Sequence, residues 1–146
     1  MSIDLISLWH SRARPNPSHG DMNKQLGCHF EEVAEMLEEL CGDDEYSHEL
    51  LTQVTAKMHK IAEALKSGTA SVGIRDRRAV LDALCDQIVT ATGVAHCARM
   101  NITEGVRRVN TSNWTKYDHE GKPIFDRNGK ITKGPNYTPP DLTGLY

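Results

Sequence analysis

The most constraining feature of this sequence is a nearly unbroken apolar stretch of helical length, VLDALCDQIVTATGVA, at residues 80–95. At about 100° per residue, its apolar side chains would surround almost the whole circumference of an α-helix, and a helix of that kind is normally buried. Its only charged side chains are Asp82 and Asp86. Because burying an unpaired carboxylate costs free energy, we expect basic side chains, backbone donors or bound cations to balance these two acids.

Three further segments carry apolar side chains at helical spacing. Residues 3–12 predict a short helix before a proline-containing link, and residues 25–42 and 46–67 predict two amphipathic helices that end near glycines. The apolar helix is expected to run to about residue 98 and to continue, bent, towards Arg108. We therefore predict an all-α domain of three or four helices.

The chain changes character at Asn110, where helical periodicity stops and Gly, Pro, Asn and Lys become frequent. Asn128-Gly129 is a typical hairpin turn, so KPIFDRNGKITKG predicts a small hairpin within this tail. No internal repeat is apparent. With 146 residues the chain is most simply one domain, residues 1–146, with a helical core at 1–109 and a tail at 110–146.

Charge and composition exclude several classes of function. The net charge of -3 provides no basic excess for binding nucleic acid. No stretch reaches the roughly 18 apolar residues of a membrane span, and no signal peptide is recognised at the start. Four cysteines without a CxxC pair indicate reduced thiols. We expect a cytoplasmic protein without nucleic-acid or membrane partners.

A second group of acids lies on the helix predicted at residues 25–42. Glu32, Glu35 and Glu39 project almost opposite its apolar face at about 100° per residue. A solvated face would explain this stripe by itself. If the stripe packs against Asp82 and Asp86, however, four or five carboxylates converge, and they cannot all remain ionised without cations.

Two partners for such a cluster are open. Carboxylate-only sites favour hard cations such as Mg²⁺ or Mn²⁺. The alternative is that basic side chains before or after the apolar stretch form ion pairs with Asp82 and Asp86, in which case the two aspartates have a structural role. We favour metal ions over ion pairs. The basic candidates are Arg75, Arg77, Arg78 and Arg99.

The motifs EEVAE (31–35) and DALCD (82–86) resemble the EExxE…(E/D)xx(x)D signature of the all-α nucleoside triphosphate pyrophosphohydrolases, a superfamily that includes MazG, dimeric dUTPases and phosphoribosyl-ATP pyrophosphohydrolase. VNTSNWTK (109–116) and EGKPIFDRNGKITKGPNYTPPDL (120–142) are similar to the C-terminal pattern of MazG-like proteins from bacteria and phages. The match covers roughly residues 26–142. This resemblance implies a MazG-like helical bundle with the irregular tail and its small hairpin.

The resemblance also implies roles for particular residues. Glu32 and Glu35 match the metal ligands of the first motif, and Asp86 matches the last aspartate of the second. Asp82 stands four residues before Asp86, whereas many members have Glu three residues before it. Together these four residues would hold two or more Mg²⁺ or Mn²⁺ ions, and Glu35 or Glu38 would accept the proton of the attacking water.

The start of the tail supplies the predicted contacts to the substrate. An acidic metal cluster needs positive or neutral donors on the other side of a polyphosphate. Lys116 is expected to contact a phosphate as a mobile point charge, and the amides of Asn110 and Asn113 to donate to phosphate or sugar oxygens.

The expected reaction converts a nucleoside or deoxynucleoside triphosphate, with a purine such as dGTP favoured, to the monophosphate and pyrophosphate, which would control the nucleotide pool. Relatives of this kind complete their sites by association, so we expect a homotetramer built as a dimer of dimers, in the host cytoplasm if a phage encodes it. Three alternatives are open: the same site acting on phosphoribosyl-ATP, the same site acting on an alarmone, and a helical regulatory module without catalytic activity.

Overall fold

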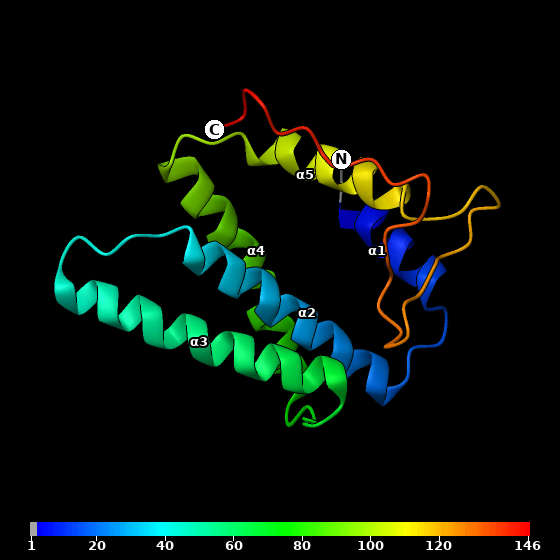
Figure 1. The fold of residues 1–146 in the computed structure, drawn as a ribbon, viewed down its shortest axis with the longest axis horizontal. Coiled ribbons are helices and arrows are strands. Elements are labelled where there is room, and N and C mark those ends of the chain that lie inside the picture. The colour runs from blue at the N-terminus through cyan, green and yellow to red at the C-terminus, as the bar shows by residue number, and fades with distance from the viewer. Residues whose placement is uncertain (1–2) are drawn as a thin grey trace. The chain divides into compact units, whose positions relative to one another are not determined.

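The computed structural model describes residues 3–146, and five α-helices follow one another in this part of the chain (Figure 1). No β-strand is formed in the same residues. The predicted all-α class is therefore confirmed. The helices are α1 (Ile3–Ala13), α2 (His19–Glu38), α3 (Glu45–Ser67), α4 (Arg77–Cys97) and α5 (Ile102–Trp114).

The helices belong to two compact units. One unit is Asn16–Gly73 and contains α2 and α3. The other combines the residues up to Pro15 with Ile74–Tyr146, so it contains α1, α4, α5 and the C-terminal tail. The tail therefore shares a unit with the first helix, which is a different grouping from a division at residue 109.

Helices α2 and α3 form an antiparallel hairpin (Figure 1). Their contact is built from small residues: Ala34 and Ala62 are 0% and 1% exposed, and Leu65 is the largest side chain that is fully buried. The backbones approach closely at Gly27, where an added Cβ would lie 2.8 Å from the carbonyl oxygen of Ala62. Only a residue without a side chain fits at position 27 at this separation.

Helix α2 begins six residues earlier than the apolar pattern predicted. The reason is a capping box at its start: Ser18 Oγ accepts a hydrogen bond from the Asp21 N–H (3.1 Å), and the Ser18 N–H donates to the Asp21 carboxylate (2.9 Å). Reciprocal bonds of this kind satisfy backbone donors that the first turn leaves unpaired. Polar local chemistry, which an apolar period does not report, therefore sets this boundary.

The C-terminal tail is anchored to α1 by aromatic residues. The rings of Trp9 and Tyr117 are stacked, with centroids 5.8 Å apart, and both residues are buried. The Tyr117 hydroxyl donates to the Trp9 carbonyl (2.6 Å), and Trp9 Nε1 donates to the Asn113 carbonyl (3.0 Å). Trp114 and Ile131 pack against this pair. Trp9 is thus a core residue of its unit.

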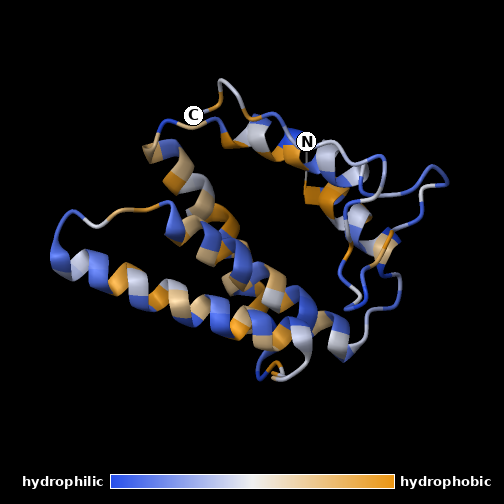
Figure 2. Ribbon diagram, in the orientation of Figure 1, coloured by the Kyte–Doolittle hydropathy of each residue, from blue (hydrophilic) through white to orange (hydrophobic). Residues whose placement is uncertain are grey.

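Burial of the apolar helix, the first expectation from the sequence, is wrong for the single chain. Of the residues in α4 only Ala95 is buried, while Leu81, Val89 and Val94 are 65%, 68% and 62% exposed. Figure 2 shows apolar residues along this helix. Among the helices of its own unit α4 packs only against α5, so that unit leaves most of its circumference uncovered.

The expected bent continuation of α4 towards Arg108 is also wrong. The helix ends at Cys97, and Arg99 adopts a left-handed conformation with φ of 60°. A separate helix, α5, then starts at Ile102 and is capped by Asn101, whose side chain accepts a hydrogen bond from the Glu104 N–H (3.2 Å). Helix α5 runs on through Trp114, into the segment predicted to lack helical structure.

Tertiary contacts explain why α5 extends so far. Its last turns contain Asn, Thr and Ser, which are weak helix formers. The Ser112 hydroxyl donates to the Thr138 carbonyl (2.6 Å), and the Asn113 carbonyl accepts from Trp9. Contacts with α1 and with the tail therefore stabilise a helix end whose local sequence would not indicate it.

Two consecutive turns in the tail share one sequence pattern, YDHEGKP and FDRNGKI. In each, the aspartate side chain (Asp118 or Asp126) accepts hydrogen bonds from the backbone two and four residues later, and the glycine (Gly121 or Gly129) has φ near +75°. One antiparallel bridge closes each turn. The tail thus contains a short repeat that the sequence analysis missed. Around Asn128-Gly129 the described residues form this single bridge, Phe125 to Ile131, rather than a pair of strands.

Two findings bear on the environment of the chain. Within residues 3–146, none of the helices combines the length and the apolar character needed to cross a bilayer. Within the same residues no disulfide joins any of the four cysteines, and three of the four are exposed.

Candidate functional site

The acids of α2 divide into two groups according to their partners. Glu31 forms an ion pair with Lys66, and Glu38 accepts a hydrogen bond from His59 Nε2 at 2.7 Å, so both are tied to α3. Glu32 and Glu35 are exposed, and neither carboxylate has a partner among residues 3–146. Glu39, which directly follows α2 and belongs to the same predicted stripe, is also exposed and without a partner in the described residues, so two of the three free acids match the ExxE ligands.

This division follows from the helix geometry. Gly27 and Ala34 face α3, and positions next to that contact reach across to its basic side chains. Glu32 and Glu35 are three residues apart, which places them on one face of α2. Glu32 and Glu35 therefore present two neighbouring carboxylates of the kind that can bind a hard cation. Of the two residues predicted to accept a proton, Glu35 is the one without a partner in the described part of the chain.

The second acidic pair lies on α4, where Asp82 and Asp86 are separated by four residues and share a face. Both residues are exposed. Within the described residues, no ion pair joins either carboxylate to an arginine. The candidates Arg75, Arg77, Arg78 and Arg99 lie in the same unit and pair with neither aspartate. The ion-pair alternative of the sequence analysis is therefore not what this unit adopts.

The predicted metal ligands are distributed over the two units, with Glu32 and Glu35 in Asn16–Gly73 and Asp82 and Asp86 in the other. Within either unit taken alone, no three His, Cys, Asp or Glu side chains of residues 3–146 gather as a metal-binding group. Each unit thus contains one of the two predicted pairs, and all four carboxylates lack a partner in the described residues. Oxygen ligands of this charge fit Mg²⁺ or Mn²⁺, which seldom bind to a cage made by protein alone.

The residues predicted to contact substrate lie around the end of α5. Asn110 is 6% exposed, and Asn110 and Asn113 line a common cavity. Lys116 follows the helix end, and its Nζ lies 6.0 Å from the centre of the Trp9 ring. This ammonium group forms no ion pair within the described residues, so it is available to an anion. The structure brings the two asparagines together and places the lysine outside the cavity lining.

The cavity that contains the asparagines is the main feature that sequence reasoning missed. It is an open groove of about 520 Å³ lined by α5, the end of α4, Ile6 of α1 and the C-terminal residues. Its walls are mostly aliphatic and carry no charged side chain. The walls include Ile6, Val106, Val109, Asn110, Asn113 and Leu142.

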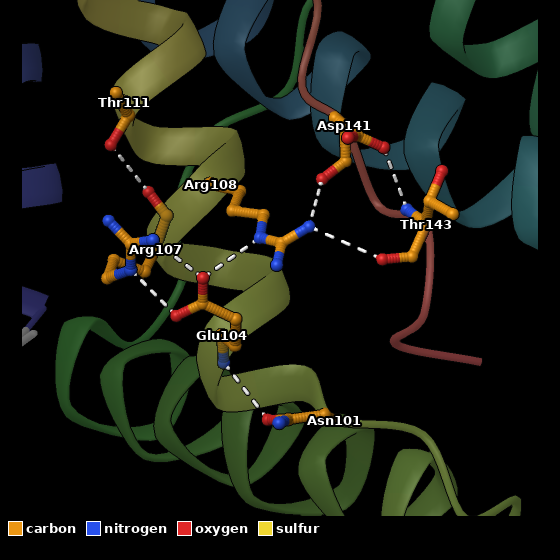
Figure 3. A network of polar contacts seen from close by, with 7 residues as sticks. All are labelled: Asn101, Glu104, Arg107, Arg108, Thr111, Asp141 and Thr143. Atoms are coloured by element: carbon orange, nitrogen blue, oxygen red, sulfur yellow. Dashed lines mark hydrogen bonds and ion pairs between the residues drawn. The ribbon is translucent and has the colours of Figure 1, made fainter.

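A polar network lies on α5 beside the C-terminal segment (Figure 3). Glu104 accepts hydrogen bonds from Arg107 (2.6 and 2.7 Å) and from Arg108 (2.9 Å), and Arg108 also donates to the Asp141 carbonyl at 2.7 Å. The hydrogen bonds from Arg107 are the main reason why the pKa of Glu104 falls to about 2. An open cleft of about 570 Å³ adjoins these residues. Because one carboxylate already binds both guanidinium groups, we assign the network to holding the C-terminal segment on α5.

Comparison of the chain with models of known protein families, with curated proteins and with solved structures returns no match.

Proposed function

We propose that this protein is a metal-dependent nucleoside triphosphate pyrophosphohydrolase that releases pyrophosphate and a nucleoside monophosphate. The observation that carries this proposal is the pattern of unpartnered carboxylates. Glu32 and Glu35 remain without a partner while α3 binds their neighbours Glu31 and Glu38, and Asp82 and Asp86 form no ion pair with the arginines of their unit in the described residues. These four residues are also the ones that match the motifs of the all-α pyrophosphohydrolases.

In this proposal Glu32 and Glu35 in one unit and Asp82 and Asp86 in the other would be the ligands of Mg²⁺ or Mn²⁺, and such ions would supply the positive charge that a triphosphate requires. Glu35 accepts a proton from the attacking water, because its carboxylate is not occupied by a protein partner. Lys116 contacts a phosphate from the other side. Water attacks the α-phosphorus, the bond to the bridging oxygen of the β-phosphate breaks, and pyrophosphate leaves.

The exposed apolar side of α4 supports self-association. Leu81, Val89 and Val94 are each more than 60% exposed, and burying apolar area of this kind favours association. We propose that a second copy of the chain covers this helix and that two such dimers form a tetramer. Light scattering combined with the activity assay tests this: an active species of 16.3 kDa would contradict it.

The deciding experiment measures pyrophosphate release from a panel of nucleotides, with and without Mg²⁺ or Mn²⁺. The panel contains the standard nucleoside and deoxynucleoside triphosphates, dGTP included, together with phosphoribosyl-ATP and an alarmone. We expect Mg²⁺-dependent hydrolysis with preference for a purine deoxynucleotide. Release of inorganic phosphate in place of pyrophosphate would contradict the reaction, and no hydrolysis of any compound would favour a regulatory module.

Two variants test the carboxylates. Glu35→Gln and Asp86→Asn should abolish hydrolysis and leave the helical circular dichroism spectrum unchanged. Matched controls are Glu63→Gln and Asp43→Asn, which make the same chemical changes at exposed positions outside both motifs. Full activity of either test variant with Mg²⁺ present would refute the proposed site.

A further inference from the structure

Residues 68–76 join α3 to α4 and connect the two units of the chain. The division between the units falls inside this link, after Gly73. The sequence of the link, GTASVGIRD, is rich in small residues, and residues 71–76 are exposed. A connection of this kind is normally mobile along its whole length. Hydrogen bonds nevertheless hold the first part of it on the hairpin of α2 and α3.

The main hold on the link is made by Asn23, near the start of α2. This residue is 4% exposed. Its side-chain oxygen accepts a hydrogen bond from the Val72 N–H (2.7 Å), and its side-chain nitrogen donates to the Val72 carbonyl (3.2 Å). A carboxamide presents a donor and an acceptor side by side, so one asparagine binds both backbone groups of Val72. Losing hydrogen bonds from a buried side chain costs free energy, and Val72 is therefore held on α2.

Two further contacts hold the preceding residues of the link on the same unit. The Ala70 N–H donates to the Ala64 carbonyl near the end of α3 (3.0 Å). The Ser71 hydroxyl lies 3.2 Å from Nε2 of His19, and the same nitrogen lies 3.1 Å from the side-chain nitrogen of Asn23. The link thus stays in contact with its own unit as far as Val72.

Beyond Val72 these contacts stop. Residues 73–75 form no hydrogen bond or ion pair among the described residues, and a Cβ built on Gly73 would meet no atom within 4 Å. The start of α4 is then fixed by Asp76, whose side chain accepts hydrogen bonds from the Arg78 and Ala79 N–H groups. In the described part of the chain, the free segment between Val72 and this cap therefore consists of residues 73–75.

The length of the free segment matters because the predicted metal ligands lie on both sides of it, so this inference rests on the proposed function. Glu32 and Glu35 precede the link, and Asp82 and Asp86 follow it. An ion bound by both pairs closes a loop through the link, and the entropy cost of closing a loop rises with the number n of flexible residues as about (3/2)RT ln n. A shorter free segment therefore favours binding of the ion by both pairs.

Asn23 sets the length of the free segment. If Val72 were released, the nearest backbone hydrogen bond of the link would be that of Ala70. The free segment would then grow from residues 73–75 to residues 71–75. Because the entropy cost depends on the logarithm of this length, metal binding across the link would weaken roughly twofold.

We propose that Asn23 is a positioning residue for the metal site: by holding Val72 on α2, it shortens the flexible connection between the two pairs of predicted ligands. In this proposal Asn23 contacts neither the ion nor the substrate. Its effect passes through the link, so removing Asn23 weakens metal binding and shortening the link restores it.

The first measurement is Mn²⁺ binding to the full chain without nucleotide, by isothermal titration calorimetry. Asn23→Ala should raise the dissociation constant roughly twofold. In the activity assay, the Mn²⁺ concentration that gives half the maximal rate should rise by the same factor, while kcat at saturating Mn²⁺ stays unchanged. Gln53→Ala is the matched control, because it removes a side-chain amide that binds Glu49 (2.9 Å) in the same unit and does not touch the link.

Two changes in the link itself separate positioning from a loss of stability. Inserting Gly-Ser-Gly-Ser-Gly-Ser after Gly73 triples the length of the free segment and leaves Asn23 in place, so the dissociation constant should rise roughly fivefold. Deleting Gly73 and Ile74 in Asn23→Ala returns the free segment to its original length, so Mn²⁺ binding should return to that of the wild type. Shortening the link would not repair a general loss of stability.

Hydrogen exchange shows whether the link is released. The Val72 amide should exchange faster in Asn23→Ala than in the wild type or in Gln53→Ala, because its acceptor has been removed. Equal exchange in the three proteins would overturn the proposal.

The binding results distinguish this proposal from the proposed function. Mn²⁺ binding that requires Glu35 and Asp86 but is unchanged in Asn23→Ala and after the insertion would overturn the positioning role and leave the proposed function standing. Weaker binding in Asn23→Ala that the deletion does not restore would overturn the positioning role as well. Absence of Mn²⁺ binding by the wild type, or binding that is unchanged in Glu35→Gln and Asp86→Asn, would refute the proposed function and the positioning role together.

Discussion

The close contact between α2 and α3 at Gly27 gives a quantitative test of the helical hairpin that presents Glu32 and Glu35. In Gly27→Ala the new methyl carbon would lie 2.8 Å from the Ala62 carbonyl oxygen and 2.8 Å from Lys66 Cγ. The lysine side chain can move. The backbone carbonyl cannot move unless the two helices separate, and that separation would loosen the buried contact of Ala34 and Leu65.

Two effects of opposite sign determine the size of the change. Replacing glycine with alanine in a helix stabilises a protein by about 0.4–1 kcal/mol, mostly through the unfolded state. Overpacking a tight contact costs about 1–3 kcal/mol. Gly20→Ala in the same helix is the control, because its added Cβ meets only Ser18 Oγ at 3.7 Å, an ordinary contact. Subtracting the control cancels the first effect and leaves the cost of the clash.

Urea unfolding followed by far-ultraviolet circular dichroism measures both variants. We expect Gly20→Ala to be slightly more stable than the wild type, and Gly27→Ala to be less stable than Gly20→Ala by about 1–3 kcal/mol. Both tryptophans lie outside the unit of α2 and α3, so their fluorescence reports the other unit and serves as an internal reference. Equal stabilisation by the two substitutions would show that α2 and α3 do not approach closely at Gly27.

Three further predictions follow from particular contacts. Tyr117→Phe removes the hydroxyl that donates to the Trp9 carbonyl, so the free energy of unfolding measured by tryptophan fluorescence should fall by about 1 kcal/mol. Burial raises the pKa of Tyr117, so above about pH 10 its hydroxyl ionises in the unfolded protein before it does so in the folded protein. The stability of the wild type should therefore decline above that pH more steeply than the stability of the variant. Hydrogen bonds from Arg107 hold the pKa of Glu104 at about 2, below its ordinary 4.5, so the ionised carboxylate stabilises the fold above pH 4.5 and this stabilisation is lost as the pH falls towards 2. In urea titrations the stability difference between the wild type and Glu104→Gln should therefore shrink from about pH 7 to about pH 3. A difference that stays constant over this range would contradict the role assigned to Glu104. Lys116→Ala should raise KM or lower kcat at least tenfold, about 1.4 kcal/mol, while Mg²⁺ binding without nucleotide persists, and unchanged kinetics below saturation would exclude a phosphate contact.

The sequence predicted most of the helices because their signals are local. Apolar spacing located α1, α3 and most of α2 and α4, since a helix that buries one face must repeat its apolar residues with the helical period. The start of α2, the break between α4 and α5, and the part of α5 beyond Arg108 escaped this approach. The first and the last of these depend on hydrogen bonds: the capping box of Ser18 in one case, and contacts of Ser112 and Asn113 with distant carbonyl and indole groups in the other.

The candidate site shows the same division. Sequence spacing identified which acids share a helix face, because four residues make about one turn. It did not show which acids have partners. That depends on α3, which brings Lys66 and His59 to Glu31 and Glu38 and leaves Glu32 and Glu35 free. The arginines that precede or follow this stretch were the less favoured partners of Asp82 and Asp86 in the sequence analysis, and none of them pairs with these acids in the described residues.

The sequence by itself determined the all-α class, the positions of the main helices and the two acidic motifs, because helical period and caps are properties of neighbouring residues. Only the tertiary structure decided that α4 keeps an exposed apolar surface, that the tail packs on Trp9 of α1, and that Gly105 and Asn110 face one cavity. These features join residues that lie far apart in the chain, and their energies come from packing and desolvation. A linear pattern records which residues can make such contacts, and the fold selects the ones that form.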